Sequence, residues 1–406
     1  MSATLQVAIA SRVFLPEPAA ASFRLGAVAE ALVADGAQVR VLTSGLPTGT
    51  PSQDCVPIKG EEIRRFPVLR DKSGYVRGYL PYMSFDIPLF FRLLFGPRLD
   101  AVLVEPPPTT GLVTRLACGL RRVPYVWYAA DVWSDATEIA GAPRTVVRAV
   151  RAMEKFSVRG ASGIIAVSDG VKDRVVALGG RNVRVIPNGI DTDTYKVDID
   201  PFSKEELAAL GIRSRYMIYA GTASEWQGAL IFAEAMEQVA ESEQDLQLVF
   251  VGQGSEWGDI RAQAEKLRRV HGRDVIVQLP SAPPEVVARL LVSAEAALVS
   301  IVPGQGYDFA YPTKVLAALA AGRRVLFAGV GPAAEDLVRE KLGQVSDYEV
   351  GAVAEMMRRA PAHDPDQGTH RRSWIMSGRS LKDSGQAAAS FVLDVARRAR
   401  RKRERK

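Results

Sequence analysis

The chain has 406 residues, 47% of them apolar, which is enough to build the cores of two domains. No run of 18 uncharged apolar residues occurs, so we expect no transmembrane helix, and the first residues, MSATLQVAIASRVFLP, lack the basic start of a signal peptide. The two cysteines, Cys55 and Cys118, lie in unrelated contexts and form no metal or redox motif. These features predict a cytoplasmic protein.

The formal net charge of +6 is concentrated at the carboxyl end, where the last ten residues hold eight Lys or Arg and one Glu. The rest of the chain is therefore close to neutral. A nucleic-acid interface would need basic and aromatic residues on one face of a fold, so we expect no nucleic-acid partner. Two interpretations of 397–406 remain open: a disordered, solvated end, or a contact with an anionic membrane.

The first half alternates continuous apolar runs with helical patterns. Such runs, rather than alternation, indicate strands covered on both faces, and hence a parallel sheet. The expected strands are 5–10, 38–43, 100–105, 124–129, 163–168 and 183–187, and the expected helices are 20–34, 109–120, 143–160 and 169–178.

The same pattern restarts after a polar stretch, 189–205, which we interpret as a linker. The second set of strands is expected at 216–221, 246–252, 275–279, 296–300 and 324–329, and a last helix at about 385–400. The sequence therefore predicts an α/β protein with two doubly wound, Rossmann-like domains, 1–190 and 191–380, and a carboxyl-terminal helix within 381–406 that packs on either of them. Ligands bind such folds at the carboxyl ends of the strands, here in a cleft between the domains.

Two expected strands of the second half end in glycine, at Gly221-Thr222 and at Gly252-Gln253-Gly254, where a backbone could approach a phosphate. The segment YPTKVLAALAAG, 311–322, predicts a helix that starts after Pro312 with Lys314 in its first turn. The first strand lacks G-x-G-x-x-G, which argues against an NAD- or FAD-dependent reductase.

Several segments together resemble the GT-B glycosyltransferases of the large retaining family 4. They are FLPEPAAASFRLGAVAEALVADGAQVRVLTS (14–44), IIAVSDGVKDRVVALGG (164–180), VIPNGIDTDTY (185–195), YAGTASEWQGALIFAEAM (219–236), FVGQGSE (250–256) and YPTKVLAALAAGRRVLFAG (311–329). The resemblance implies an amino-terminal acceptor domain, a carboxyl-terminal domain for a nucleotide-sugar, most commonly a UDP-sugar, retention of configuration, and no metal or other cofactor.

The residues bear on the last two points. Asp191 and Asp193 match the Asp-x-Asp pattern of a metal site, but short matches of this kind recur at 198–200 and 364–366, so we expect Asp191 to cap a turn. All three histidines lie in the second half, which leaves no histidine base in the first domain and favours a retaining reaction, in which the leaving diphosphate accepts the proton.

The donor site is expected to depart from the family pattern. The segment GTASEWQG, 221–228, has no basic residue where many relatives have an Arg and a Lys, and Ala317 occupies the position of a ribose-binding Glu. The diphosphate would then be bound by Lys314 and by backbone amides at Gly221 and 312–314. The candidate donor residues are Gly221, Thr222, Gln227, Gly252, Gln253, Asp308, Tyr311, Pro312, Thr313 and Glu335, with Asp308 or Glu335 replacing the missing carboxylate.

On the acceptor side, segments after two expected strands supply Glu105, Thr109 and Trp133 as contacts for hydroxyl groups, and Asp131 and Lys314 are the catalytic candidates. Residues 75–95 hold seven aromatic residues but are interrupted by Pro81 and Pro88, and either a lipid-facing helix or a covered core helix fits them.

The sequence thus predicts a transferase that moves a hexosyl or amino-hexosyl unit to a hydroxyl acceptor, which is a lipid-linked sugar, a glycan or a small molecule. Three alternatives stay open: a catalytically degenerate partner subunit, a nucleotide-sugar 2-epimerase, and a membrane-tethered binding module.

Overall fold

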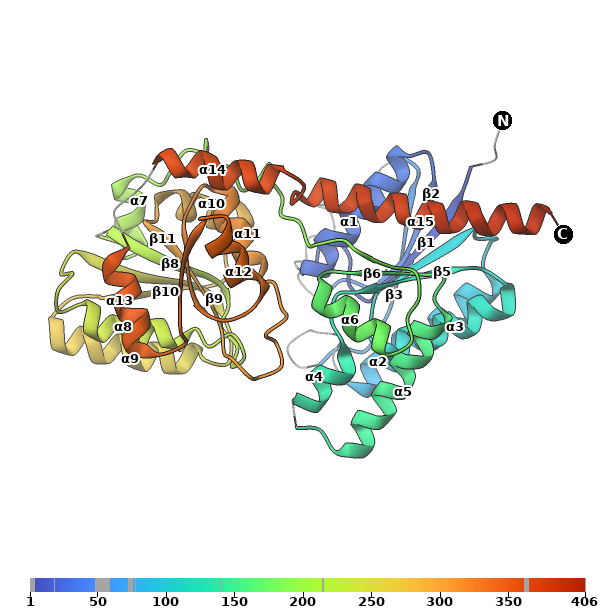
Figure 1. Cartoon of the computed structure of the whole chain (residues 1–406), viewed down its shortest axis with the longest axis horizontal. Coiled ribbons are helices and arrows are strands. Elements are labelled where there is room, and N and C mark those ends of the chain that lie inside the picture. Colours follow the sequence, from blue (N-terminus) through green and yellow to red (C-terminus); the bar gives the residue numbers. More distant parts are fainter. Residues whose placement is uncertain are drawn as a thin grey trace. The chain divides into compact units, whose positions relative to one another are not determined.

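The computed structural model describes residues 4–17, 19–47, 59–71, 76, 78–139, 141–213, 215–360 and 365–405. Of the residues and segments named above, positions 1–3, 18, 55, 75, 77, 363, 364 and 406 lie outside these ranges. The described chain divides into two compact units, 1–188 with 381–406, and 189–380. Each unit contains one parallel sheet with helices on both faces (Figure 1).

Unit 1 contains seven strands in the order β3-β2-β1-β4-β5-β6-β7, all parallel. The strands are β1 (Gln6–Ala10), β2 (Gln38–Ser44), β3 (Glu61–Phe66), β4 (Ala101–Val104), β5 (Tyr125–Ala129), β6 (Gly163–Ala166) and β7 (Val183–Val185). The helices are α1 (Ala20–Ala34), α2 (Tyr79–Phe95), α3 (Pro108–Arg121), α4 (Trp133–Ile139), α5 (Arg144–Gly160), α6 (Asp169–Ala177) and α15 (Leu381–Glu404).

Helices α1 and α15 pack together over one face of this sheet and share a core with β1, β4, β5 and β6. Helices α2, α3 and α5 pack side by side as a second group. At Gly385 an added Cβ would lie 2.7 Å from the Ala27 carbonyl oxygen, so the absence of a side chain permits the close approach of α15 to α1.

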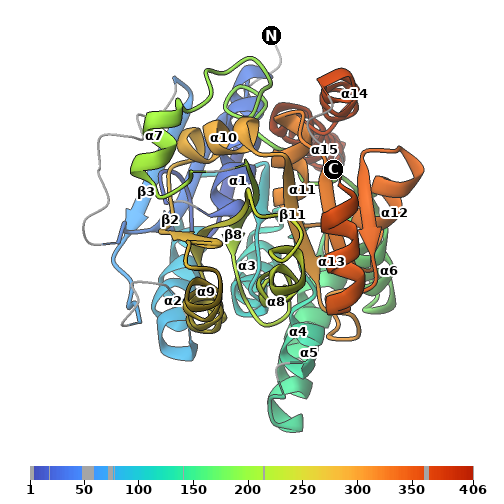
Figure 2. The ribbon, with the colours of Figure 1, turned by 90° about the vertical axis from the view of Figure 1, so that its left-hand side faces the viewer.

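Unit 2 contains six parallel strands in the order β10-β9-β8-β11-β12-β13. The strands are β8 (Arg215–Thr222), β9 (Leu246–Gln253), β10 (Ile276–Leu279), β11 (Ala296–Ile301), β12 (Val325–Gly329) and β13 (Gly343–Ser346). The helices are α7 (Lys204–Ala209), α8 (Leu230–Val239), α9 (Trp257–His271), α10 (Pro284–Ser293), α11 (Thr313–Ala320), α12 (Pro332–Arg339), α13 (Val350–Arg359) and α14 (Pro365–Met376). Two apolar cores lie on opposite faces of this sheet, one under α10, α11 and α12 and the other under α8, α9 and α13 (Figure 2).

One local expectation is wrong, an open alternative is decided, and the bounds of the linker are refined. Residues 79–95 form one continuous helix that contains Pro88, because proline removes a single helical hydrogen bond and the buried face of α2, which includes Phe85 and Leu89, holds the remaining turns in place. The last residues are helical up to Glu404 rather than disordered. The segment expected to be a linker includes the start of α7, whose Ser203 and Glu206 form a reciprocal capping box.

No helix among the residues described is both long enough and apolar enough to cross a membrane.

Candidate functional site

The carboxyl edge of the unit 2 sheet is built from glycine turns packed backbone to backbone. Gly252 (φ 147°) is the last residue but one of β9, and a Cβ there would lie 2.1 Å from the Gly221 carbonyl oxygen. At Gly254, directly after β9, a Cβ would lie 2.0 Å from the Ala223 carbonyl oxygen. No side chain fits at these distances. The two turns therefore lie close together because glycine occupies both positions.

Lys314, in the first turn of α11, reaches this edge. Its Nζ donates to the Tyr219 hydroxyl at 2.5 Å and to the Thr222 carbonyl at 3.2 Å, and it lies 3.9 Å from the centre of the Tyr219 ring. The neighbouring Gly221 leaves room for the lysine, because a Cβ there would be only 3.3 Å from Lys314 Cε. The ammonium is thus held at the ends of β8 and β9.

Burial lowers the pKa of Lys314 to about 7, although the Glu256 carboxylate opposes the shift. Among the residues that the structure describes, none forms an ion pair with Lys314: its direct contacts are a hydroxyl, a carbonyl and a ring, and the Glu256 carboxylate acts on it only without a direct contact. An anion bound here would supply the missing counter-charge and raise this pKa.

The start of α11 adds backbone donors. Pro312 is its N-cap and makes no side-chain capping bond, and the first turn has no acidic residue. Pro312 has no amide hydrogen, so of residues 312–314 only Thr313 and Lys314 offer N–H groups; the expectation for Pro312 as a donor is corrected on this ground.

The other expected donor residues divide into two groups. Thr222 pairs with Gln253 in the β8–β9 register, close to Lys314, and both side chains are exposed. Gln227 is buried, and its Oε1 accepts from the Ser224 hydroxyl at 3.1 Å. That bond fixes the turn after β8.

The second group follows β11 and β12. Asp308 Oδ1 accepts from the Gly304 amide at 3.0 Å, and the Tyr311 hydroxyl donates to Asp336 at 3.2 Å. Glu335 is exposed on α12, and Ala317 is buried in the apolar core beneath α11. No hydrogen bond between described residues links Asp308, Tyr311 or Glu335 to Lys314.

One aromatic pair beside these loops was not predicted. Trp226 stacks on Tyr307 with ring centres 4.5 Å apart and planes 23° apart. The two residues are 81 positions apart, so only the pairing of β8 with β11 brings their loops together.

In unit 1, a cavity of about 170 Å³ opens at the carboxyl ends of the adjacent strands β1, β4 and β5. Its lining includes three of the expected residues, Glu105, Asp131 and Trp133, together with Arg12. Thr109 does not line this cavity: it is buried on α3, near the Asp86 carboxyl.

Glu105 is almost fully buried and forms an ion pair with Arg24, which also donates to Asn188 Oδ1 at 3.0 Å. Burial raises the pKa of Glu105, and the Arg24 guanidinium opposes that shift. The second carboxylate oxygen, Oε2, has no hydrogen-bond partner. One oxygen therefore remains able to accept from a ligand hydroxyl, while the other holds the ion pair.

Asp131 lies at the exposed rim of the cavity, directly after β5. The surrounding protein atoms raise the pKa of this carboxyl, and the charge of Arg24 opposes them.

Arg12 follows β1 and was not among the predicted site residues. Its guanidinium lies 4.0 Å from the centre of the Tyr82 ring and 5.8 Å from that of Trp133, and these rings meet edge to face at 6.2 Å. It also donates to the Val76 carbonyl at 3.3 Å, whereas its buried Nε has no partner. The cavity thus combines the cation of Arg12 and the ring of Trp133 with the carboxylates of Glu105 and Asp131, and Tyr82 packs against Arg12 outside the lining.

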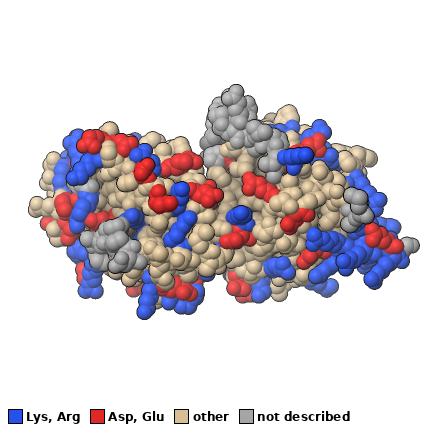
Figure 3. Space-filling view, turned by 90° about the horizontal axis from the view of Figure 1, so that it is seen from above, with Lys and Arg blue, Asp and Glu red and all other residues tan. Residues whose placement is uncertain are grey.

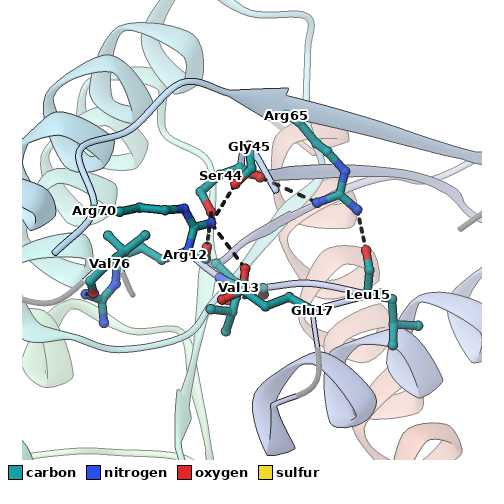
Figure 4. A network of polar contacts seen from close by, with 10 residues as sticks. Arg12, Val13, Leu15, Glu17, Ser44, Gly45, Arg65, Arg70 and Val76 are labelled. Carbon is teal, nitrogen blue, oxygen red and sulfur yellow. Dashed lines mark hydrogen bonds and ion pairs between the residues drawn. The ribbon is translucent and has the colours of Figure 1, made fainter. Parts of the chain in front are cut away.

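Two more arginines, Arg65 and Arg70, form hydrogen bonds that hold the loop after β1, which contains Arg12 (Figure 4). Arg70 donates to Glu17 and Ser44 at 3.2 Å and to the Gly45 carbonyl at 2.6 Å, and Ser44 donates to the Arg12 carbonyl at 2.6 Å. Arg65 donates to the Leu15 carbonyl. These bonds tie the turn after β1 to the end of β2.

Trp133 is held by the first turn of α4. The buried Glu154 carboxylate accepts from the Trp133 amide at 2.8 Å and from the Ser134 amide at 2.9 Å. Burial raises the pKa of Glu154, and these bonds oppose the shift. A carboxylate at a helix start is favoured by the free amides there, so Glu154 orients one wall of the cavity.

Asp191 of the Asp-x-Asp match accepts from the Asp193 amide at 3.0 Å and from the Thr194 hydroxyl at 2.6 Å, as expected for a residue that caps a turn. Within the described ranges, no three His, Cys, Asp or Glu side chains converge on a point where a metal ion could bind.

Family models match both units. Residues 20–189 match the glycosyl transferase 4-like domain, and residues 214–360 match the glycosyl transferases group 1. Together the two segments span more than half of the chain. No curated protein sequence matches it.

Solved structures resemble the whole chain at low sequence identity. The Anabaena protein HepE, crystallised with UDP and glucose, has a TM-score of 0.68 and 16% identity over 96% of this chain and 100% of its own. Sucrose-phosphate synthase from Thermosynechococcus elongatus has a TM-score of 0.73 and 16% identity over 96% and 99%. WaaG, a glycosyltransferase involved in lipopolysaccharide biosynthesis, has a TM-score of 0.70 and 19% identity over 95% and 99%.

Proposed function

Because the chain belongs to the group 1 (family 4) glycosyltransferases and has their GT-B fold, we propose that it transfers a hexosyl or amino-hexosyl unit from a UDP-sugar to a hydroxyl acceptor, with retention and without a metal ion. The observation that carries the donor half of this proposal is the unpaired ammonium of Lys314 beside the glycine turns of unit 2.

The donor diphosphate binds at this edge. Lys314 supplies the charge, and Gly221, Thr313 and Lys314 supply backbone amides, an arrangement in which main-chain N–H groups and one cation replace a Lys/Arg pair. Thr222, Gly252 and Gln253 lie around the same point, whereas Gln227, Asp308, Tyr311 and Glu335 shape the surrounding loops. Structures of HepE contain UDP and UDP-glucose, which supports UDP as the nucleotide.

The acceptor binds in the cavity of unit 1. Asp131 accepts a hydrogen bond from the reacting hydroxyl and orients it, Glu105 Oε2 accepts from a second hydroxyl, and Trp133 packs on the acceptor's apolar face. Thr109 makes no direct contact in this arrangement and contributes through the buried Asp86 instead.

In the reaction, the bond between the anomeric carbon and the diphosphate oxygen breaks as the acceptor oxygen bonds to the same face of that carbon. The acceptor proton moves to the departing diphosphate oxygen, so no histidine is needed on unit 1. Lys314 stabilises the charge that develops on the diphosphate, and positioning by the two units supplies most of the remaining acceleration.

The first experiment is a thermal-shift panel of UDP-, GDP- and dTDP-sugars on the purified full chain, followed by analysis of the products. We expect a UDP-sugar to stabilise the fold selectively and to be slowly hydrolysed or transferred. A chain that binds no nucleotide-sugar refutes the proposal. A chain that binds a nucleotide-sugar but shows no turnover in the presence of acceptors is a degenerate subunit. Ala317 and the absence of basic residues in 222–228 would then explain the loss of activity. Conversion of the nucleotide-sugar into its epimer without an acceptor identifies an epimerase.

The proposal also places the protein in the cytoplasm, in contact with an anionic membrane through residues 397–406, because this segment carries the whole excess of positive charge. The acceptor classes that fit are a lipid-linked sugar, a glycan or a small molecule.

A further inference from the structure

The solvent-facing side of α2 is apolar over several turns. Leu80, Ile87, Phe91 and Phe95 follow one another at helical spacing, and all four side chains are exposed, Phe95 by 78%. The rings of Phe91 and Phe95 stack on each other with their centres 6.2 Å apart. Phe91 also meets the Phe90 ring edge to face at 5.3 Å, yet half of its side chain stays exposed. A contiguous exposed apolar surface of this kind marks a site of interaction with a protein or a membrane.

Helix α3 extends this surface. It packs beside α2 and exposes Leu116 and, by 69%, Leu120. Arg121, at the end of α3, donates to the Leu93 carbonyl at 2.8 Å and to the Pro97 carbonyl at 3.0 Å, so the carboxyl ends of the two helices are joined.

The basic end of α15 lies at the same edge of unit 1. Arg403 donates to the Arg122 carbonyl, directly after α3, at 3.1 Å. A cavity of about 430 Å³ between the start of β4 and the end of α15 has Arg98, Arg400 and Arg403 in its lining. Figure 3 shows Lys and Arg side chains gathered where α15 ends.

This charge is largely unbalanced. Arg398, Arg401 and Lys402 form no ion pair among the residues that the structure describes. Their spacing puts like charges four residues apart, for example Arg398 and Lys402, which destabilises an isolated helix, and the run of cations extends beyond the last turn that the helix dipole favours. The helix end therefore lacks counter-charges that a partner could supply.

From these contacts we propose that unit 1 docks on the surface of an anionic lipid bilayer. The docking face consists of Phe91, Phe95, Leu116 and Leu120 together with the cations of α15 from Arg397 onward, Arg98 and Arg122. The cations meet anionic headgroups, and the exposed rings and leucines enter the boundary between headgroups and acyl chains. This inference rests on the membrane contact proposed above and adds an apolar surface to it, which consists of Phe91, Phe95, Leu116 and Leu120 and is called the apolar half below.

The apolar half reaches the acceptor cavity along one helix. Tyr82, in the first turn of α2, lies against Arg12 and Trp133, and Phe95 ends the same helix of 17 residues. Docking through Phe91 and Phe95 therefore brings the cavity within about 25 Å of the lipid surface.

The experiment is co-sedimentation of the full chain with phosphatidylcholine vesicles, with and without phosphatidylglycerol. We expect binding only to the vesicles that contain phosphatidylglycerol. The variant Arg398→Gln/Arg401→Gln/Lys402→Gln should bind about 100-fold more weakly. The matched control Arg261→Gln/Arg268→Gln/Arg269→Gln removes three cations from α9 and should change binding less than about twofold.

The apolar half is tested separately with Phe91→Ser/Phe95→Ser. We expect this variant to lose about 10-fold or more in vesicle binding and to lose the part of binding that persists at high salt, because rings buried in lipid are not screened. Val270→Ser/Val338→Ser, which changes exposed side chains of α9 and α12, is the control and should bind as the unaltered chain does.

Equal binding to neutral and anionic vesicles, or equal losses in the variants and their controls, would overturn the proposal. Binding of single-stranded RNA that depends on Arg398, Arg401 and Lys402, with no vesicle binding, would assign the cations to nucleic acid instead. The thermal shift that a UDP-sugar causes separates the two proposals. Vesicle binding without a UDP-sugar shift supports docking and refutes the proposed function. A UDP-sugar shift without vesicle binding refutes docking alone.

Discussion

The protonation of Lys314 should make donor binding depend on pH near neutrality. Burial lowers the pKa of Lys314 to about 7 in the free protein, and a bound diphosphate raises it by placing negative charge beside the ammonium. The protonated fraction of the free protein falls from about 0.9 at pH 6 to about 0.1 at pH 8. If only the protonated form binds tightly, the Kd for a nucleotide-sugar rises about tenfold over this interval.

The assay is isothermal titration of the full chain with UDP-glucose, whose diphosphate diester keeps the same charge over these pH values. In buffers of different ionisation enthalpy at pH 7.5, binding should take up about 0.8 protons, the deprotonated fraction of Lys314 in the free protein. Lys314→Met is the control, since it keeps the length of the side chain but cannot titrate, and its weaker binding should be independent of pH.

A Kd for the unaltered chain that changes less than about twofold between pH 6 and pH 8 would refute the reasoning. The same tenfold change in Lys314→Met would refute it as well, because the titrating group would then lie elsewhere.

Three further changes test the contacts around the two sites. Gly252→Ala puts a methyl group against the Gly221 carbonyl oxygen, and we expect urea unfolding to show a loss of about 2–4 kcal/mol. Tyr219→Phe keeps the ring under Lys314 but removes the hydroxyl that accepts from it, so donor Kd should rise about tenfold while the fold remains intact. Arg24→Met leaves Glu105 buried without its partner and should cost about 3–5 kcal/mol at pH 8. This cost should shrink toward pH 5, because burial raises the pKa of Glu105 and the protonated acid needs no counter-charge.

Each of these three substitutions has its own control or contradicting outcome. Gly258→Ala, at a helical glycine with open space around it, should be close to neutral and shows that the loss at Gly252 comes from the close approach. A change at Tyr219 that lowers the melting temperature as much as it weakens donor binding would mean that the residue only supports the fold. A stability loss in Arg24→Met that stays constant with pH would contradict the role given to the Glu105 charge.

Strands β3 and β13 and helix α4 were not predicted from the sequence, for identifiable physical reasons. Strand β3 has the sequence EEIRRF, whose charged side chains suit an edge of the sheet and give no apolar run. Strand β13, GQVS, is short and lies at the other sheet's edge. Helix α4 depends on Glu154, a residue 21 positions after Trp133, to satisfy its first amides, so its own seven residues contain little that predicts it.

The candidate site shows the same division. The positions of Lys314, in the first turn of a helix, and of Gly221 and Gly252, at the ends of buried strands, were predictable from local sequence, whereas their part in donor binding stays a prediction. Arg12 was not predictable, because its position in the cavity depends on the rings of Tyr82 and Trp133, which are 70 and 121 positions away in the chain.

By itself, the sequence determined the strands that lie in the middle of each sheet, the α/β class and the place of Lys314 in the first turn of a helix, since each follows from burial pattern or backbone geometry within about a dozen residues. Tertiary structure alone decided which carboxylates share a cavity, that Glu105 is paired and Asp131 exposed, and that the basic end of α15 is bonded to the residue that follows α3. These are contacts between distant segments, and their free energies depend on desolvation and charge in the folded state, which no local pattern records.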